Sequence, residues 1–263
     1  MTDVRVLNVV GAWILAMAIL GAEPVAVRSV EGEVHGFLAL RTLEGATIAD
    51  GDLVQQARGT RVTTRLTFRF RDGSLHDETA VFQQQRAFRL VSDHLVQKGP
   101  SFPHPLEMSI NAAAGVVTVR HTEDGKQKEE SEHLNLPADL SNGLIPTLLK
   151  NVRSSAPPRR FSLVVATPRP RLVRLLITPA GDDRFWTGSE TRAATHYVLK
   201  VDIGGISGVL APLVGKQPPD SHVWILGGQA PDFVKSEQQM YYGGPVWRIE
   251  LVAPAWRQGT AEK

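Results

Sequence analysis

The chain has 263 residues, of which 42% are hydrophobic and 21% charged, a balance typical of folded globular proteins that excludes wholesale disorder. Its 29 Lys and Arg residues against 27 Asp and Glu residues give a net charge of +2, too small for a nucleic-acid binder held by charge. The absence of Cys excludes disulfides, thiolate nucleophiles, iron–sulfur clusters and Cys-ligated zinc.

The first 22 residues have the pattern of a secretory signal. A short start containing Arg5 precedes an uncharged run over residues 9–20, and small residues end at Ala22. The run is shorter than the ~20 residues that a membrane-spanning helix needs. We therefore expect residues 1–22 to be a signal peptide and residues 23–263 to be exported, to the periplasm or the extracellular space. A buried first helix of the domain is the alternative.

Strict alternation over residues 61–71 predicts a half-buried strand. Val62, Leu66 and Phe68 point to one side and arginines to the other, with a period of two that no amphipathic helix shows. Asp72 and Gly73 then supply a hairpin turn. The whole chain shows about ten such segments at the spacing of β-sandwiches and barrels. The others lie at residues 74–84, 86–97, 106–110, 117–119, 128–134, 161–166, 172–178, 195–203, 222–226 and 247–252.

One helix is expected to interrupt the strands. It begins at Pro137, and Pro146 is expected to kink it. An apolar residue recurs every fourth position, which gives one stripe that can cover a sheet. The stripe consists of Leu140, Leu144 and Leu148.

Residues 203–215 form a second apolar segment without any charge. Its glycines and Pro212 prevent a stable strand or a long helix. We consider two interpretations, a buried connection across one end of the sheet and a mobile flap at the mouth of a pocket that contacts ligand through Val209 and Leu210. Residues 154–158 are the best linker, but strands on both sides look alike, so we expect one β-rich domain over residues 23–263.

Familiar catalytic and metal-binding motifs are absent from the sequence. The G-x-S-x-G pattern around Ser207 fails at Val209, and a P-loop fails because Leu210 occupies the place of its first glycine. The eight His residues include no H-E-x-x-H pattern and no pair at i,i+4 spacing. We therefore expect no cofactor and no metal.

His94 is the candidate polar anchor of a binding site. Alternation along residues 86–97 assigns His94 to the same face as Phe88 and Leu90, which is the apolar face. We therefore expect its imidazole to project inward, where it can hydrogen-bond a ligand or act as a base. A core histidine satisfied by its neighbours is the alternative.

Basic residues gather in one part of the chain. Seven of them, and no acidic residue, lie between Lys150 and Arg174. Such a stretch can make peripheral contact with anionic components of the bacterial envelope, and a solvated strand face is the alternative. Aromatic residues are not interleaved as in single-strand nucleic-acid binders, so we expect no nucleic-acid partner.

Three stretches carry a resemblance to known proteins. Residues 92–100, 222–228 and 243–250 resemble segments of exported bacterial proteins of unknown function. The layout of a long β-meander with a helix laid against it is similar to that of the periplasmic lipoprotein-carrier half-barrels. The second resemblance rests on layout alone, and a shared fold does not imply a shared function.

The sequence thus predicts a mainly β protein, a strongly curved antiparallel meander of half-barrel or barrel-like form with one covering helix. The favoured function is non-catalytic binding of an apolar or amphiphilic, lipid-like molecule in the bacterial envelope. The expected ligand-binding residues are His94, Phe68, Phe70, Phe88, Leu90, Met108, Val209 and Leu210. The alternatives are a periplasmic hydrolase that uses His94 with Asp93 or a distant carboxylate, and a structural envelope protein without a ligand. The oligomeric state is left open.

Overall fold

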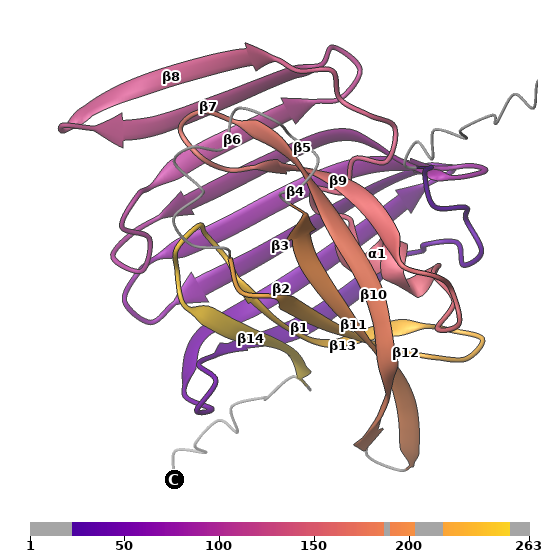
Figure 1. Cartoon of the computed structure of the whole chain (residues 1–263). Helices are drawn as coiled ribbons and strands as arrows, with labels where there is room; N and C mark the ends of the chain where they lie inside the picture. Colours follow the sequence, from indigo (N-terminus) through magenta and orange to yellow (C-terminus); the bar gives the residue numbers. More distant parts are fainter. Residues whose placement is uncertain (1–22, 187–189, 203–217, 253–263) are drawn as a thin grey trace, which may run out of the picture.

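The computed structural model describes residues 23–186, 190–202 and 218–252 (Figure 1). Within these ranges fourteen strands form one antiparallel sheet in the order β8-β7-β6-β5-β4-β3-β2-β1-β14-β13-β12-β11-β10-β9. The strands are β1 Val34–Arg41, β2 Thr47–Arg58, β3 Arg61–Phe70, β4 Leu75–Gln84, β5 Phe88–Lys98, β6 Leu106–Asn111, β7 Val116–Glu123, β8 Lys126–His133, β9 Arg159–Val165, β10 Arg171–Trp186, β11 Thr191–Asp202, β12 Ser221–Leu226, β13 Asp232–Gln239 and β14 Val246–Val252. The expected signal peptide and the residues Val209 and Leu210 lie outside the described residues.

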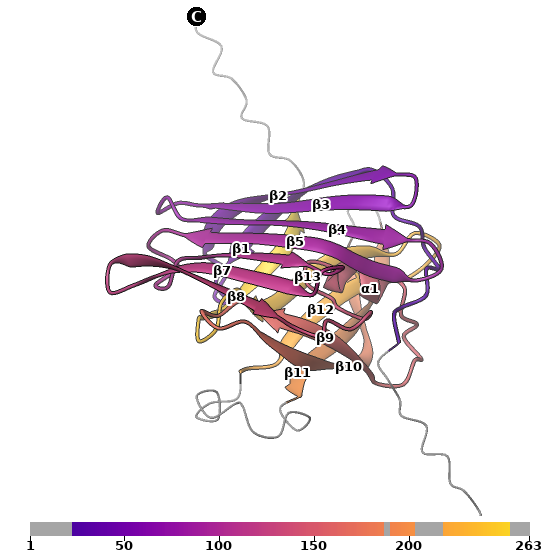
Figure 2. The ribbon, with the colours of Figure 1, turned by 90° about the horizontal axis from the view of Figure 1, so that it is seen from above.

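The sheet curves strongly but does not close. Figure 2 shows β2–β5 along one side, β9–β11 along the other, and the short helix α1 (Ile145–Lys150) between them. In the described part of the chain the two terminal strands, β8 and β9, do not pair with each other. The predicted fold class, a strongly curved antiparallel sheet of barrel-like form with one helix, is therefore confirmed.

A segment just before α1 occupies the free edge of β9. Ser141 donates its backbone N–H and its hydroxyl to the Ser162 carbonyl, over 2.9 and 2.7 Å. The Asn142 side chain exchanges two hydrogen bonds of 2.9 Å with the backbone of Val164. These bonds satisfy polar groups that an unpaired edge strand would leave open. The other free edge, β8, is instead protected by exposed charged residues, which disfavour pairing with a further strand.

Two hydrophobic clusters occupy much of the space between the sheet's walls. The larger is built around buried aromatic and aliphatic side chains of β4–β7 and β9–β12, together with the segment before α1 and α1 itself. The smaller lies under β1–β3 and β14, where Phe70 and Phe102 pack edge to face at 5.3 Å between ring centroids. Phe68 and Trp247 belong to the same smaller cluster.

Every strand expected from alternation is present, but β1, β2 and β13 were not expected. Their sequences break the period of two. Gly51 stands between two aspartates in the middle of β2, and β13 is almost entirely polar. These three segments are strands because they pair with neighbouring strands on both sides, and not because of their local sequence pattern.

The expected long helix is wrong in its bounds. The helix begins at Ile145, so Pro146 sits in its first turn, where a missing N–H costs nothing and no kink results. The residues before it pair with β9 instead of continuing a helix, because Leu140 forms a β-bridge with Ser162. Leu144 and Leu148 are buried as expected. Among the described residues no helix is long and apolar enough to cross a membrane.

The inward orientation predicted for His94 is also wrong, and a β-bulge is the reason. Val81 pairs with Ser92 whereas Phe82 pairs with Leu90, so Val91 is an extra residue in β5. One inserted residue reverses the alternation of everything that follows it. The next residue after Ser92, Asp93, is consequently buried, while the His94 side chain is 46% exposed on the outer face.

The packing of Phe68 gives a direct test of this register. A Cβ added at Gly51 would lie 2.6 Å from Phe68 Cδ1 and 3.0 Å from Leu38 Cβ, so Gly51→Ala overpacks the smaller cluster. We expect Gly51→Ala to lower the free energy of unfolding by about 1–3 kcal/mol in a urea titration. Gly32→Ala is the matched control, because no atom lies within 4 Å of its added Cβ, and we expect a change below about 1 kcal/mol. Equal losses in the two variants would contradict the assigned register.

Candidate functional site: an interior cavity

A cavity of about 420 Å³ lies between the two walls of the sheet. Its lining comes from β1–β6 on one wall, from β9–β14 on the other, and from the segment that includes α1. Its volume falls within the ~300–1,000 Å³ typical of small-molecule sites. Most of its wall is aliphatic, with Leu53, Leu66, Leu95, Met108, Leu163 and Leu199 as representatives.

Polar side chains reach the cavity from several elements, and one group of them lies on the inner face of β3 and β4. Thr64, His76 and Glu78 line the cavity there. The carboxyl of Asp93, on the neighbouring strand β5, lies close to Glu78 but outside the described cavity lining. A Cβ at Gly143 would lie 3.2 Å from Asp93 Oδ1 and 3.6 Å from Glu78 Oε1, so both carboxyls converge on this cavity-lining glycine.

The surroundings of the two carboxyls favour their neutral forms. Burial raises the pKa of Glu78 to about 7. The pKa of Asp93 lies well above its ordinary value, because of burial first and the negative charge of Glu78 second. Asp93 is 2% exposed, and neither of its carboxyl oxygens makes a hydrogen bond of good geometry within the described part of the chain. The two groups form a buried acidic pair without a resident counter-ion.

His76 adds no positive charge to this wall. Burial lowers its pKa to about 4, so the imidazole is neutral near pH 7. Gln97 Nε2 lies 3.1 Å from His76 Nδ1 and 2.6 Å from the Met240 carbonyl, and it donates to both. Since Nδ1 accepts a hydrogen bond, the imidazole proton sits on Nε2.

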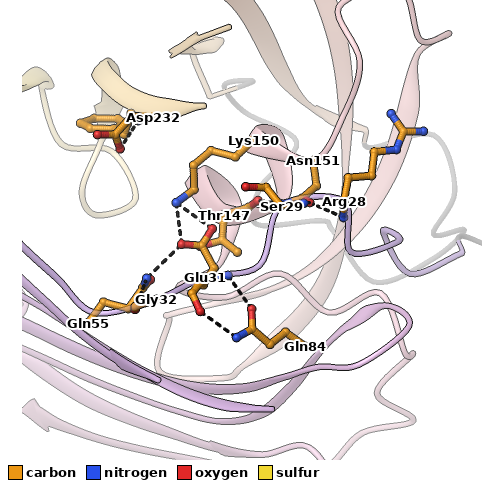
Figure 3. Close-up of polar contacts among 11 residues, drawn as sticks. Arg28, Ser29, Glu31, Gly32, Gln55, Gln84, Thr147, Lys150, Asn151 and Asp232 are labelled. Carbon is orange, nitrogen blue, oxygen red and sulfur yellow. Dashed lines mark hydrogen bonds and ion pairs between the residues drawn. The ribbon is translucent and has the colours of Figure 1, made fainter. Parts of the chain in front are cut away.

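A buried ion pair lies where α1 meets the β2 wall (Figure 3). Lys150 Nζ contacts both carboxylate oxygens of Glu31 at 2.7 Å, and Gln55 donates to the same carboxylate at 2.9 Å. Gln84 holds the Glu31 backbone through two further hydrogen bonds of 2.7 and 2.8 Å. Lys150 and Gln55 also line the cavity. The ammonium of Lys150 is therefore already neutralised by Glu31.

The chain before Glu31 is held at α1 as well. Asn151 Oδ1 accepts hydrogen bonds of 2.7 Å from the backbone N–H groups of both Arg28 and Ser29, as Figure 3 shows. Asn151 in turn donates to the Thr147 carbonyl inside the helix. The segment leading into β1 thus connects α1 to the wall formed by β2 and β4.

The structure distributes the sequence-predicted binding residues over three environments. Met108 lines the cavity. Phe68, Phe70, Phe88 and Leu90 are buried, but within the packed clusters rather than in the described cavity lining.

His94 faces away from the cavity. Its Nε2 lies 3.1 Å from Glu107 Oε1 on the outer face, whereas the neighbouring Asp93 points to the interior. Val209 and Leu210 lie outside the described residues.

Sequence reasoning missed Glu78 and the Glu31–Lys150 pair, and it considered Asp93 only as a partner of His94, on the opposite face of the strand. Glu78 was detectable, because alternation in β4 assigns it to the same face as Ala80 and Phe82. Asp93 was not detectable by that rule, since the bulge at Val91 reverses it. In the described ranges no three His, Asp or Glu side chains are placed to hold a metal ion.

Comparisons with known proteins give one structural likeness. The chain matches no known family model and no curated protein. It is similar to the crystal structure of a beta-barrel-like protein of domain of unknown function DUF1849 from Brucella abortus, at 12% sequence identity and a TM-score of 0.45. The match covers 85% of this chain and 98% of that one. We draw no functional conclusion from a likeness of this degree.

The acidic pair predicts how stability depends on pH. Between its ordinary pKa of 3.8 and its raised pKa, Asp93 keeps its proton when folded and loses it when unfolded. The unfolded chain then binds fewer protons, so this group makes stability fall as pH rises. We expect the free energy of unfolding of Asp93→Asn, relative to the parent, to increase by more than about 1 kcal/mol from pH 4 to pH 8.

His76 has the opposite effect but is present in both proteins. Its lowered pKa makes stability rise with pH between about 4 and 6.5, and this contribution cancels in the difference. Denaturant titrations at several pH values measure the difference directly. A value that does not change with pH would show that Asp93 is ionised in the folded protein.

Proposed function

We propose that this protein binds an apolar or amphiphilic small molecule in its interior cavity and acts without catalysis. The observation that carries the proposal is a cavity of about 420 Å³ with a largely aliphatic wall. Apolar surface in contact with water is unfavourable by ~25 cal/mol per Å², so an apolar occupant is stabilised there. Protein interiors are otherwise close-packed, and a space of this size is more than a packing defect.

The uneven lining of the cavity favours an amphiphile over a purely apolar molecule. Leu163, Val173 and Leu199 present an aliphatic surface on the wall formed by β9–β11. Polar groups from β3 and β4, represented by Thr64 and Glu78, lie on the opposing wall. A molecule with an apolar body and one polar group can satisfy both walls at once.

Export to the bacterial envelope is part of this proposal. Its support is the uncharged run within residues 1–22, which has the pattern of a secretory signal. A similarity to lipoprotein carriers has the support of layout alone. Peripheral contact with anionic envelope components has the support of the basic stretch that follows Lys150, although one member, Arg160, already pairs with Asp202 at 3.0 Å.

The geometry does not support the two alternative functions equally. A hydrolase based on His94 lacks support, because the imidazole is on the outer face with Glu107 and the Asp93 carboxyl is on the inner one. A structural protein without a ligand is the outcome that failed binding would favour.

Two neighbouring residues of β2 supply a matched test of the site. Leu53 lines the cavity, and Val54, the next residue, is exposed on the outer face. Diphenylhexatriene is a neutral, rod-shaped probe that fluoresces in apolar surroundings. We expect the parent protein to bind it, Leu53→Trp to weaken binding by about tenfold or more by filling the space, and Val54→Trp to change it by less than about twofold.

Circular dichroism and urea titration of both variants establish that each is folded. Absence of probe binding by the parent protein would overturn the proposed function. Equal effects of the two tryptophans would place the probe somewhere other than the cavity.

A further inference from the structure

The described cavity lining has three carboxyl groups, those of Glu78, Asp202 and Asp232, and no free Lys or Arg cation. Lys150 is its one Lys or Arg side chain among the described residues, and both oxygens of Glu31 already bind its ammonium. His76 is neutral, since Gln97 donates to its Nδ1 and burial disfavours its charged form. Glu78 at the wall and Asp93 behind it therefore have no described cationic partner in the cavity.

A neighbouring hydroxyl also lacks a partner. Thr64 lines the cavity, is 9% exposed, and its Oγ1 has no hydrogen-bond partner among the described residues. Thr64 pairs with Ala80 across β3 and β4, and Ala80 pairs with Asp93 across β4 and β5, so the three form one row. Glu78 lies two residues from Ala80 on the same face of β4. Unpartnered buried polar groups are rare in native proteins, and several in one place point to a missing ligand group.

The chemistry of these groups discriminates between ligand types. An anionic head, such as the carboxylate of a fatty acid, would meet two carboxyls and no free cation, and like charges repel strongly in a poorly hydrated space. A metal ion would need more ligands than this row provides. A primary ammonium has three N–H donors and one positive charge, which match carboxyl and hydroxyl oxygens.

We propose that the ligand carries a primary ammonium group on its apolar body, with Glu78 receiving that ammonium at the cavity wall. Thr64 Oγ1 accepts a second hydrogen bond from it, and its positive charge favours the ionised form of Glu78, which burial disfavours in the absence of a cation. Asp93, on the neighbouring strand β5, is a second carboxyl close to Glu78. This inference rests on the proposed function and specifies the class of the ligand. The aliphatic wall of β9–β11 then holds the hydrocarbon part.

Three ligands with the same chain and different heads test the proposal. Dodecylamine, dodecanol and dodecanoate are each used to displace diphenylhexatriene from the parent protein, below their micellar concentrations. We expect dodecylamine to displace the probe at an about tenfold lower concentration than dodecanol. Dodecanoate should be the weakest of the three, because it brings a second negative charge to Glu78.

Two Glu-to-Gln variants locate the effect. Glu78→Gln removes the charge and keeps the shape, so it should abolish most of the advantage of the amine while changing dodecanol binding by less than about twofold. Glu107→Gln makes the same change on the outer face, beside His94, and should leave the order of the three ligands unchanged.

The outcomes separate the two proposals. An amine that binds no better than the alcohol, or a preference unaffected by Glu78→Gln, would overturn the ammonium assignment while probe and alcohol binding still support the cavity as a binding site. Tightest binding of dodecanoate would also overturn it. If neither the probe nor any of the three ligands binds, the proposed function itself fails. The comparison of the three ligands on the parent protein tests the ammonium assignment even if Glu78→Gln does not fold.

Discussion

The absence of pairing between β8 and β9 is the constraint on which the rest of the structure depends. An open, strongly curved sheet has two free edges and an inner face that must still be buried. The segment between these strands covers one edge and part of the inner face. Ser141 and Asn142 bond the edge of β9, while Leu140 and Leu144 join the larger core cluster. The cavity lies between the two walls, and the segment that includes α1 forms part of its lining. The cavity is thus a consequence of incomplete closure.

The Glu31–Lys150 ion pair couples this architecture to the charge of the cavity. A buried ion pair contributes little net stability, but removing one partner leaves an unpaired buried charge at a cost of about 3–5 kcal/mol. The pair therefore fixes α1 against the β2 wall more than it strengthens the fold. It also engages the described lining's one Lys ammonium, which leaves the carboxyls of Glu78 and Asp93 without a cationic partner there. In the proposed function, this one structural interaction favours a cationic ligand group over an anionic one.

The sequence predicts those features of the structure that depend on neighbouring residues in the chain, and it does not predict those that depend on distant ones. The period of two located β3 correctly, with Val62 and Phe68 buried, because every residue of that strand obeys it. One extra residue, Val91, reverses the alternation in β5, so that the Asp93 side chain and not the His94 side chain points inward. A bulge of this kind cannot be recognised from residue type. Partners far apart in the chain are beyond such rules altogether, and Glu31 and Lys150 are separated by 119 residues. Glu78, in contrast, was within reach of the alternation rule, but its place in a polar strand end just after a turn favoured a solvated side chain.

We propose above that the cavity between the walls holds the hydrocarbon chain of a ligand, and that the head group of this ligand contacts the inner face of β3 and β4. A crystal structure of the protein with dodecylamine that carries a bromine atom at the far end of its chain tests this claim most directly, because anomalous scattering locates the bromine without reference to the protein density. The account predicts a bromine peak against the aliphatic wall of β9–β11 and the ammonium within hydrogen-bond distance of Glu78. Bromine peaks confined to the outer surface, with the cavity unoccupied, would contradict it.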